Sequence, residues 1–399
     1  MTNPQFWAED GNLFFRWQLL FGYPASVLSP YNGYLCVLQR TVAALVSVFP
    51  VYYAPLLYAL VGSVIDAACC SLFILPAFRH IVRSDWLRAG VCILTAITPP
   101  ADELVGTVVN TQWYLLLAGT LLLFRAAPSA TNTRSHQIGW GLLGLLMALT
   151  NPVLILGIPF CLWNMVRNWR WDRWYEVGLL LGLAIQLSIF AATGQTTTDW
   201  THQGRLPALT SAVAVAFVYR AMVSLVIGYK LAVAAAIAKS LTVPVTALVA
   251  FVVLLIAVLW VASNRDRAKV AIVLYVAASS LAITLGGRGA YPSFANIRDF
   301  HGFHLERYLF LAGCAFIYLM AISVEVLFRQ RHVPIQVAVL ASVLALGTFY
   351  NYRIPPFPDK HWRDSARLIQ YSKDRHELGP GHPRIVAPIV PDGWEIIFE

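Results

Sequence analysis

The chain has 399 residues, of which 58% are hydrophobic and 12% are charged, with a formal net charge of +9. Soluble domains carry about 25% charged residues, so this composition excludes an ordinary soluble domain and indicates that lipid is the solvent. The Lys and Arg residues are scattered between apolar segments, which excludes a nucleic-acid-binding surface as the source of the charge.

The N-terminal stretch contains an acidic pair and a short amphipathic segment. Glu9 and Asp10 lie in the run Phe6-Trp7-Ala8-Glu9-Asp10-Gly11. Residues 34–50 follow the turn-like Tyr31-Asn32-Gly33-Tyr34 and contain Arg40. This pattern predicts an amphipathic helix that lies at the membrane surface.

The remainder of the chain up to residue 350 is dominated by apolar segments, and we expect roughly nine or ten of them. The clearest are 51–76, 174–193, 244–263, 269–286, 305–328 and 333–349, with shorter ones at 86–101 and 110–124. Segment 138–165 is interrupted by Asn151-Pro152. Because proline breaks helix hydrogen bonding, this segment predicts either a hairpin of two short helices, which we favour, or one strongly kinked helix.

Clusters of cations after alternate segments predict the orientation. They are Arg79, Arg83 and Arg88; Arg125 and Arg134; Arg167, Arg170 and Arg173; Arg265, Arg267 and Lys269; and Arg329 and Arg331. If 138–165 is a hairpin, all of them fall on one side, which should be the cytoplasm. The opposite face then holds residues 1–50, the loops near 102, 200 and 295, and the C-terminal tail.

Two regions complete the expected organisation. Residues 211–239 are apolar but carry Arg220, Lys230 and Lys239. They form either one spanning helix or an interfacial or re-entrant segment, and the second arrangement keeps the charge pattern intact. Residues 351–399 contain seven prolines and predict a small extracytoplasmic cap of turns and short strands. The fold class is thus an all-α polytopic membrane bundle over 1–350 with a C-terminal tail over 351–399.

Acidic residues are scarce, and two pairs fall on the predicted outer face. The first is Glu9-Asp10 and the second is Asp102-Glu103. Two carboxylate pairs on one face predict a general base together with a substrate or divalent-metal site. The alternative is that each pair consists of solvated loop acids without a functional role.

Cations on the same outer face indicate an anionic ligand. Arg288, Arg298 and Arg307 frame the loop that precedes Tyr308. Cations retained on that face often bind anionic groups, and a lipid-linked phosphate or pyrophosphate would suit them. The alternative is that these side chains extend to the lipid headgroups.

Other metal-ligand patterns are weak. The six cysteines stand in apolar stretches without a CxxC pair, which predicts buried apolar thiols. His301 and His304 have the spacing of one helix face but lack a clear third ligand. No GxxxxGK[ST] motif is present, so nucleotide-driven transport is not indicated.

Five stretches in order carry a family resemblance. They are Phe6-Trp7-Ala8-Glu9-Asp10-Gly11, Pro30-Tyr31-Asn32-Gly33-Tyr34 with Arg40, Asn110-Thr111-Gln112-Trp113-Tyr114-Leu115, Arg307-Tyr308 and Pro391-Asp392-Gly393-Trp394. Together they resemble the bacterial multi-spanning glycosyltransferases of the GT-C superfamily. One departure is that only eight residues precede Glu9, where the family has a membrane helix.

The resemblance implies a transferase of the bacterial inner membrane that acts on its extracytoplasmic face. Such enzymes move a sugar from a polyprenyl-phosphate-type donor to a glycan or lipid acceptor, usually with inversion. The family's outer acidic loop corresponds to Glu9 and Asp10, with Asp10 as the expected general base. The second acidic site corresponds to Asp102 and Glu103.

The remaining expected substrate-binding residues are Asn110, Trp113, Arg288, Arg298, Arg307 and Tyr308. A divalent metal is a possible cofactor in this interpretation, and no nucleic-acid partner is expected. The alternative function is a lipid-linked oligosaccharide flippase or another non-catalytic membrane protein. A polymerase or ligase of surface polysaccharide would use the same face.

Overall fold

The computed structural model describes residues 4–98, 104–126, 133–167, 173–193, 222–228, 231–232, 234–235, 238, 242–288, 307, 309–328, 333–351 and 358–399. Within helices, it does not describe the side chains at 167, 242–244, 283–288, 343–344, 346 and 348–351.

The described chain is mainly helical. Its first half contains η1 (Asp10–Phe15), α1 (Arg16–Phe21), α2 (Ala25–Leu28), α3 (Val37–Val46), η2 (Val51–Tyr53), α4 (Ala54–Ser71), η3 (Leu72–Ile74), η4 (Pro76–Phe78), α5 (Asp85–Ala96), α7 (Thr111–Leu123), α8 (Arg134–Thr150), η5 (Pro152–Gly157), α9 (Ile158–Arg167) and α10 (Trp174–Thr193). Its second half contains α12 (Ser224–Ile227), α14 (Thr242–Val261), α15 (Asn264–Arg288), α17 (Phe310–Leu327), α18 (Val333–Asn351), α19 (Trp362–Asp374), β1 (Ile385–Ile389) and β2 (Trp394–Phe398). The expected α-helical class is therefore confirmed.

Three helices in the described residues are long and apolar enough to cross a membrane. They are Val51–Ile74, Trp174–Thr193 and Phe310–Leu327, and each falls within a predicted segment. Other apolar helices expose large side chains. Trp260 of α14 is 84% exposed and Val253 is 59% exposed. Exposed apolar faces of this kind suit contact with lipid.

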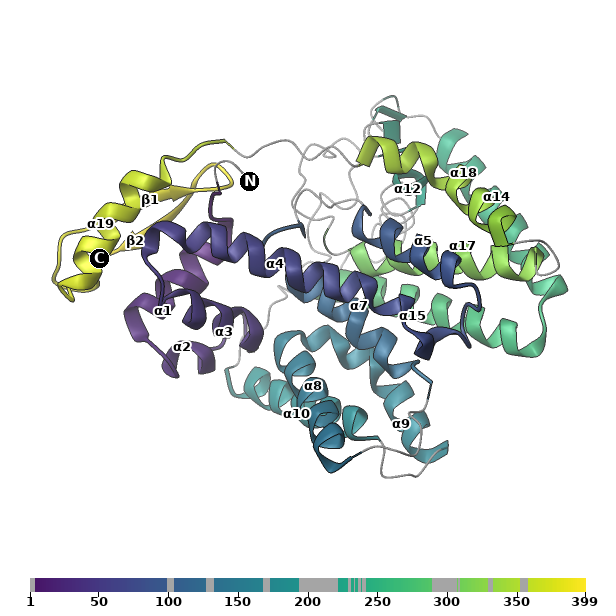
Figure 1. The fold of residues 1–399 in the computed structure, drawn as a ribbon, viewed down its shortest axis with the longest axis horizontal. Helices are drawn as coiled ribbons and strands as arrows, with labels where there is room; N and C mark the ends of the chain where they lie inside the picture. Colours follow the sequence, from purple (N-terminus) through teal and green to yellow (C-terminus); the bar gives the residue numbers. More distant parts are fainter. Residues whose placement is uncertain are drawn as a thin grey trace, which may run out of the picture.

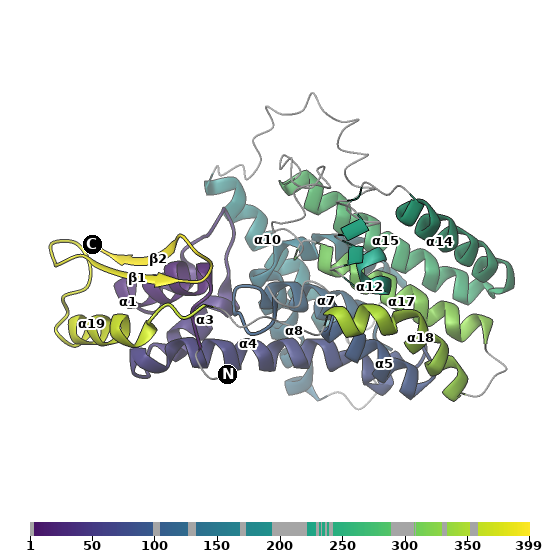
Figure 2. The ribbon, with the colours of Figure 1, turned by 90° about the horizontal axis from the view of Figure 1, so that it is seen from above.

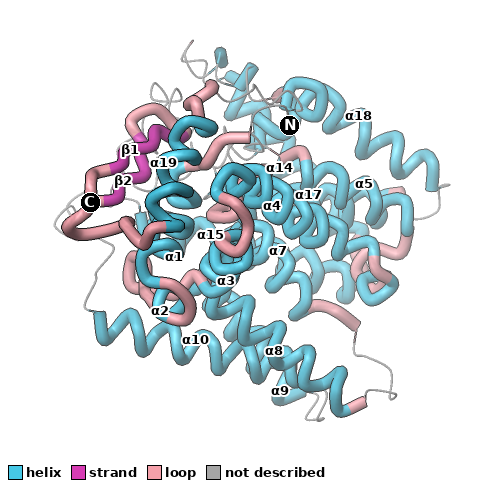
Figure 3. The backbone as a smooth tube through the Cα atoms, turned by 60° about the vertical axis from the view of Figure 1, so that its left-hand side comes forward, coloured by secondary structure: helices cyan, strands magenta, loops and turns pink. Residues whose placement is uncertain are grey.

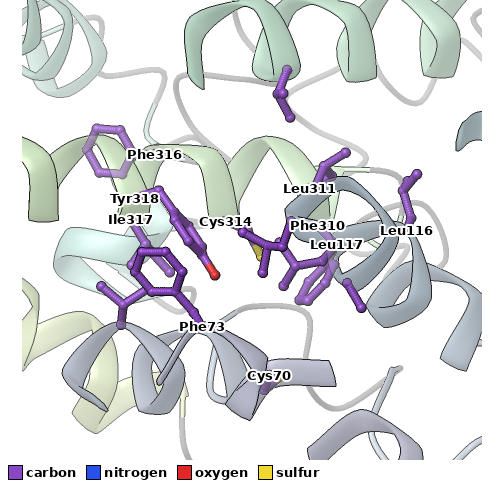
Figure 4. Packing of buried hydrophobic residues seen from close by; sticks show 14 of the residues in the cluster. Cys70, Phe73, Leu116, Leu117, Phe310, Leu311, Cys314, Phe316, Ile317 and Tyr318 are labelled. Atoms are coloured by element: carbon purple, nitrogen blue, oxygen red, sulfur yellow. The ribbon is translucent and has the colours of Figure 1, made fainter. Parts of the chain in front are cut away.

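The main core lies between α4, α5, α7 and α17. In α7 and α17 nearly every side chain is buried, as expected for helices that are apolar all round and lie inside a bundle. Figure 4 shows Phe73 and Tyr318 facing one another, with their ring centroids 4.6 Å apart in an edge-on arrangement. Cys314 lies beside them, and all six cysteines are buried and free, as predicted.

The segment 138–165 is a hairpin of two helices, as favoured. Asn151 ends α8, and its Oδ1 accepts a hydrogen bond from the N–H of Val153 at 2.9 Å. Its Nδ2 donates to the carbonyl of Gln112 at the start of α7, at 2.8 Å. Asn164 in α9 donates to the carbonyl of Leu123 at the other end of α7, at 2.9 Å. The chain therefore reverses at η5 and returns along α7.

Cations from four of the five predicted clusters gather at one end of the bundle, and Arg329 and Arg331 lie outside the described residues. Lys269 donates to the carbonyl of Ile81 at 2.9 Å, which joins the connector after α4 to the start of α15. Arg125 and Arg173 both pair with the buried Glu176, at 3.7 and 3.1 Å. The N–H of Ala126 donates to the carbonyl of Ala77 at 2.9 Å, which links these two groups. The end that holds Glu9 and Asp10 is the opposite one.

The N-terminal and C-terminal segments pack together at one side of the molecule. Figures 1 and 2 both show α19, β1 and β2 beside α1, and Figure 3 shows the same grouping from a third direction. β1 and β2 form an antiparallel pair in which Ile385 faces Phe398. The N–H of Ala8 donates to the carbonyl of Val390, and the N–H of Val390 donates to the carbonyl of Phe6 at 3.0 Å.

Two local predictions differ from the structure. The C-terminal tail contains the 13-residue helix α19 in addition to the expected strands, because Trp362, Ala366 and Ile369 form one buried face. The predicted surface helix is α3, which is shorter than 34–50, and Arg40 lies on its packed face instead of in solvent. Within 211–239, α12 ends at Gly228, whose φ is +86°, and the choice between the two predicted arrangements falls largely outside the described residues.

Candidate functional site

A pocket of about 290 Å³ lies at the N-terminal end of α7, on the side away from the cation clusters. It is lined by Glu9, Phe14, Tyr31, Asn32, Tyr34, Cys36, Gln39, Val109, Gln112, Trp113, Asn151, Pro152, Val153, Ile155, Leu183, Gln186, Leu187, Phe190 and Arg307. These residues come from η1, the turn before α3, and α3, α7, η5 and α10, together with Arg307. Segments far apart in the sequence therefore build one site.

A tight turn presents aromatic and amide side chains to the pocket. The N–H of Tyr31 donates to the carbonyl of Tyr34 at 2.8 Å, and the reverse bond is 3.1 Å. Asn32 and Gly33 between them have φ values of +50° and +83°. Two residues with positive φ define a type I′ turn, for which Asn-Gly is the preferred sequence. The turn places Tyr31, Asn32 and Tyr34 on the pocket wall.

Two buried amide side chains join the helices that surround the pocket. Gln186 of α10 accepts a hydrogen bond from the N–H of Leu35 at 2.8 Å and donates to the carbonyls of Leu35 and Ala148, at 3.0 and 3.2 Å. Asn151 is held equally by its bonds to Gln112 and Val153. These two side chains have their hydrogen-bonding capacity engaged within the protein, so their role is to hold α3, α7, α8 and α10 in place.

Glu9 and Gln39 are different, because each has an oxygen without a partner in the part of the chain that the structure describes. Oε2 of Glu9 and Oε1 of Gln39 are buried and accept no hydrogen bond from the described residues. Both side chains line the same pocket. A buried acceptor without a donor is unfavourable by about 1–3 kcal/mol. The pocket is therefore suited to a ligand that brings hydroxyl donors.

Asp10 does not line this pocket and binds the backbone before α7. Its side chain is 2% exposed. Its Oδ2 accepts the N–H of Val108 at 2.9 Å, and its Oδ1 accepts the N–H of Val109 at 2.7 Å. Burial raises the pKa of the Asp10 carboxyl well above its usual value, and the two N–H donors counteract that rise. Asp10 thus fixes the acidic loop against the start of α7.

Arg40 is a fully buried cation close to the pocket wall. Its guanidinium lies 4.9 Å from the ring centroid of Trp17 and 5.6 Å from that of Phe14. Its three side-chain nitrogens have no hydrogen-bond partner among the described residues. A desolvated cation held over aromatic faces keeps its positive field in a region of low dielectric constant. The sequence placed Arg40 beside the turn but gave no sign that it is buried.

The pocket brings together some of the predicted site residues. Glu9, Trp113 and Arg307 all line it. Asn110 is fully buried and directly precedes α7, but it does not line the pocket. The other predicted residues lie outside the described residues: Asp102, Glu103, Arg298 and Tyr308 entirely, and Arg288 in its side chain.

The sequence interpretation missed several pocket residues. Gln39 and Gln186 were not predicted, although both are polar residues inside apolar helices, which was the available signal. The expected divalent metal would depend on Asp102 and Glu103, which are not described. Among the residues that are described, no group of three or more His, Cys, Asp and Glu lies together.

In comparisons with known proteins, no family model, curated protein or solved structure matches this chain.

Proposed function

We propose that the protein is a membrane glycosyltransferase that moves a sugar from a polyprenyl-phosphate-type donor to a glycan or lipid acceptor. One observation carries the proposal, namely that the pocket combines unsatisfied carboxylate and amide acceptors with aromatic walls. Sugar hydroxyls would supply the missing donors. Trp113, Tyr31 and Tyr34 would cover the apolar faces of a sugar ring.

The negative charge on the departing phosphate needs a nearby cation, and we assign Arg307 to this role. Arg307 lines the pocket together with Glu9, so one cavity contains both an anionic and a cationic side chain. A guanidinium matches phosphate oxygens in geometry and charge. Arg40 adds a second positive charge behind the pocket wall. Both features favour the departure of a phosphate anion.

Glu9 is the base that we assign. As the acceptor oxygen forms its bond to the anomeric carbon, its proton passes to the Glu9 carboxylate. The bond between the anomeric carbon and the phosphate oxygen breaks, and the phosphate leaves with the electron pair. This direct displacement inverts the anomeric centre. Glu9 replaces Asp10 in this role because the Asp10 oxygens already accept the N–H groups of Val108 and Val109.

The location of the pocket supports an extracytoplasmic reaction. It lies at the end of the bundle opposite the cation clusters, which mark the cytoplasmic side by the positive-inside rule. In a bacterium this corresponds to the outer face of the inner membrane. The exposed apolar helices would keep the polyprenyl chain of the donor in the lipid while its phosphate reaches the pocket.

The test is sugar transfer by the purified protein in nanodiscs, with a panel of polyprenyl-phosphate sugars. We expect Glu9→Gln to reduce the transfer rate roughly 100-fold or more, the usual contribution of a general base, with the donor still bound. Glu395→Gln is the matched control, since Glu395 is exposed on β2. Transfer that is equal in wild type and Glu9→Gln would remove Glu9 from the mechanism. Absence of transfer with every donor would favour a flippase.

A further inference from the structure

A second cavity, of about 330 Å³, lies between α7, α15 and α17 near the cation end of the bundle. Its lining residues are His80, Ile81, Leu117, Thr120, Leu121, Phe124, Arg265, Ala268, Lys269, Ile272, Val273, Val276, Leu311, Ala315, Tyr318 and Ile322. Nothing in the proposed transfer reaction uses this cavity. It borders the part of α7 that follows Leu117, whereas the first pocket borders Val109, Gln112 and Trp113.

The body of the cavity is apolar and elongated. The α15 residues from Arg265 to Val276 extend about 16 Å along the helix axis. Aliphatic side chains from three helices cover this length, including Leu121, Ile272 and Leu311. The hydroxyl of Thr120 is not available to a ligand as a free donor, because it donates to the carbonyl of Leu116 at 2.7 Å. Such a channel suits a hydrocarbon chain.

The mouth of the cavity carries two cations, Arg265 and Lys269, which line it together with His80. Burial lowers the pKa of His80, and the positive charges of Arg265 and Lys269 lower it further. The nearby Asp266 is engaged, since it accepts hydrogen bonds from Ser263 at 2.7 Å and from Lys269 at 3.0 Å. Arg265 is exposed and would meet an anion directly.

We propose that this cavity binds one anionic phospholipid, with an acyl chain along α15 and its phosphate at Arg265. Charge complementarity at the mouth selects an anionic headgroup, and the apolar length selects a chain. The site lies where the positive-inside rule places the cytoplasmic headgroup layer, and anionic lipids are enriched in that leaflet. A bound lipid would fill the space between α7, α15 and α17 and hold these helices together.

The experiment is native mass spectrometry of the full chain after incubation with an equimolar mixture of phosphatidylglycerol and phosphatidylcholine. We expect one retained phosphatidylglycerol in the wild type. Arg265→Gln should weaken that retention roughly fivefold, because one cation near a membrane surface contributes about that much. Ala268→Phe should reduce retention of both lipids, since Ala268 lines the cavity and is exposed enough to tolerate the change.

Arg267→Gln is the matched control. Arg267 is exposed on the same helix turn, donates to the carbonyl of Leu259 at 3.1 Å, and does not line the cavity. Equal loss in Arg265→Gln and Arg267→Gln would indicate general surface attraction and overturn the proposal. Equal retention of both lipids in the wild type would also overturn it. If millimolar glycerol phosphate displaces phosphatidylglycerol completely, the site binds the headgroup alone, and the proposed acyl-chain site is overturned.

A melting curve of each variant in lipid-free detergent decides whether folding is intact. If Arg265→Gln melts at the wild-type temperature, its loss of lipid reports on binding alone. Sugar transfer by the first pocket is a separate readout, so failure of lipid binding leaves the proposed reaction untouched. Failure of sugar transfer with specific lipid retention would refute the reaction and leave the lipid site standing.

Discussion

Glu9 and Asp10 are sequence neighbours with opposite surroundings. Asp10 accepts two backbone N–H bonds in a buried position, and Glu9 lines an accessible pocket. Successive helical residues point about 100° apart, and here Glu9 lines the pocket while Asp10 lies against the backbone that precedes α7. The division of roles that we propose, one positioning residue and one base, follows from this geometry.

The structure predicts a distinct stability profile for Asp10→Asn. An amide can accept only one of the two N–H bonds and turns its own NH₂ toward the other, which should lower stability by about 1–3 kcal/mol. Because the folded pKa of Asp10 is raised, its protonated form favours folding at low pH, and this contribution is lost as pH rises from the unfolded value of about 3.9 through the folded pKa. The variant should therefore be less stable at low pH but lose less stability as pH rises.

Melting temperatures measured from pH 4 upward check this prediction. Asp364→Asn is the control, since the Asp364 side chain is 77% exposed on α19. A pH slope that is unchanged in Asp10→Asn would show that Asp10 does not titrate on folding. A variant as stable as the control would show that the bonds to Val108 and Val109 contribute little.

The residue scale also shows the limit of sequence reasoning. The scarcity of acids was enough to identify Glu9 and Asp10 as candidates, and the order of motifs added Trp113 and Arg307. Which carboxylate faces the pocket depends on N–H donors at Val108 and Val109, far along the chain. Hydrophobic periodicity reports only on neighbours along the chain, so it cannot indicate which of Glu9 and Asp10 lines the pocket.

At the scale of elements, glycines set a close helix contact. α8 and α10 run side by side and approach through Gly141, Gly144, Gly178 and Gly182. A Cβ added at Gly178 would lie 1.9 Å from the carbonyl oxygen of Gly141. Small residues three or four positions apart on one helix face allow such approach in membrane helices, where packing instead of the hydrophobic effect drives association. This close contact brings the Gln186 side chain within hydrogen-bond distance of the carbonyls of Leu35 and Ala148.

We predict that Gly178→Ala destabilises the protein by about 1–3 kcal/mol, because the two backbones must separate. Gly139→Ala on α8 is the matched control, since no atom lies within 4 Å of an added Cβ there. The control should be neutral or slightly more stable, as alanine favours helix over glycine. Thermal unfolding in detergent gives the comparison, and equal melting of the two variants would contradict the close contact.

Element boundaries were predictable where the sequence contains a strong physical signal. Asn151-Pro152 indicated the reversal at η5, and the long apolar runs indicated α4, α10 and α17. Helix α19 was not predicted, because the prolines at either side of it suggested turns. Its amphipathic character becomes meaningful only once the N-terminal segment supplies an apolar partner for Trp362.

At the scale of the whole molecule, the two chain ends form one small core. Phe6, Phe15 and Tyr58 pack with Trp362, and the ring centroids of Phe6 and Trp362 are 4.9 Å apart. The β hairpin adds Ile396, whose Cδ1 lies 2.9 Å from the position of a Cβ on Gly11. The segment that carries Glu9 and Asp10 is therefore held between the hairpin and α4. The tail and the segment with Glu9 and Asp10 should act as a unit.

This arrangement predicts that a change in the tail alters the candidate site. Ile396→Asp places a charge at a fully buried position against Gly11, and we expect a loss of about 3 kcal/mol or more in the stability of this core. Hydrogen exchange should then increase in residues 6–15 as well as in 385–398, and sugar transfer should fall. Val386→Asp is the control, because Val386 is 40% exposed on the outer face of the same hairpin.

The pattern of exchange separates two roles for the tail. If residues 6–15 lose protection together with the hairpin, the tail holds the Glu9 segment in place, since the bonds of Val390 to Phe6 and Ala8 join the two. If only 385–398 loses protection and transfer persists, the N-terminal segment is held by Asp10 and the α7 backbone alone. That result would make the hairpin a cover over the core and would place the positioning of Glu9 entirely in the membrane bundle.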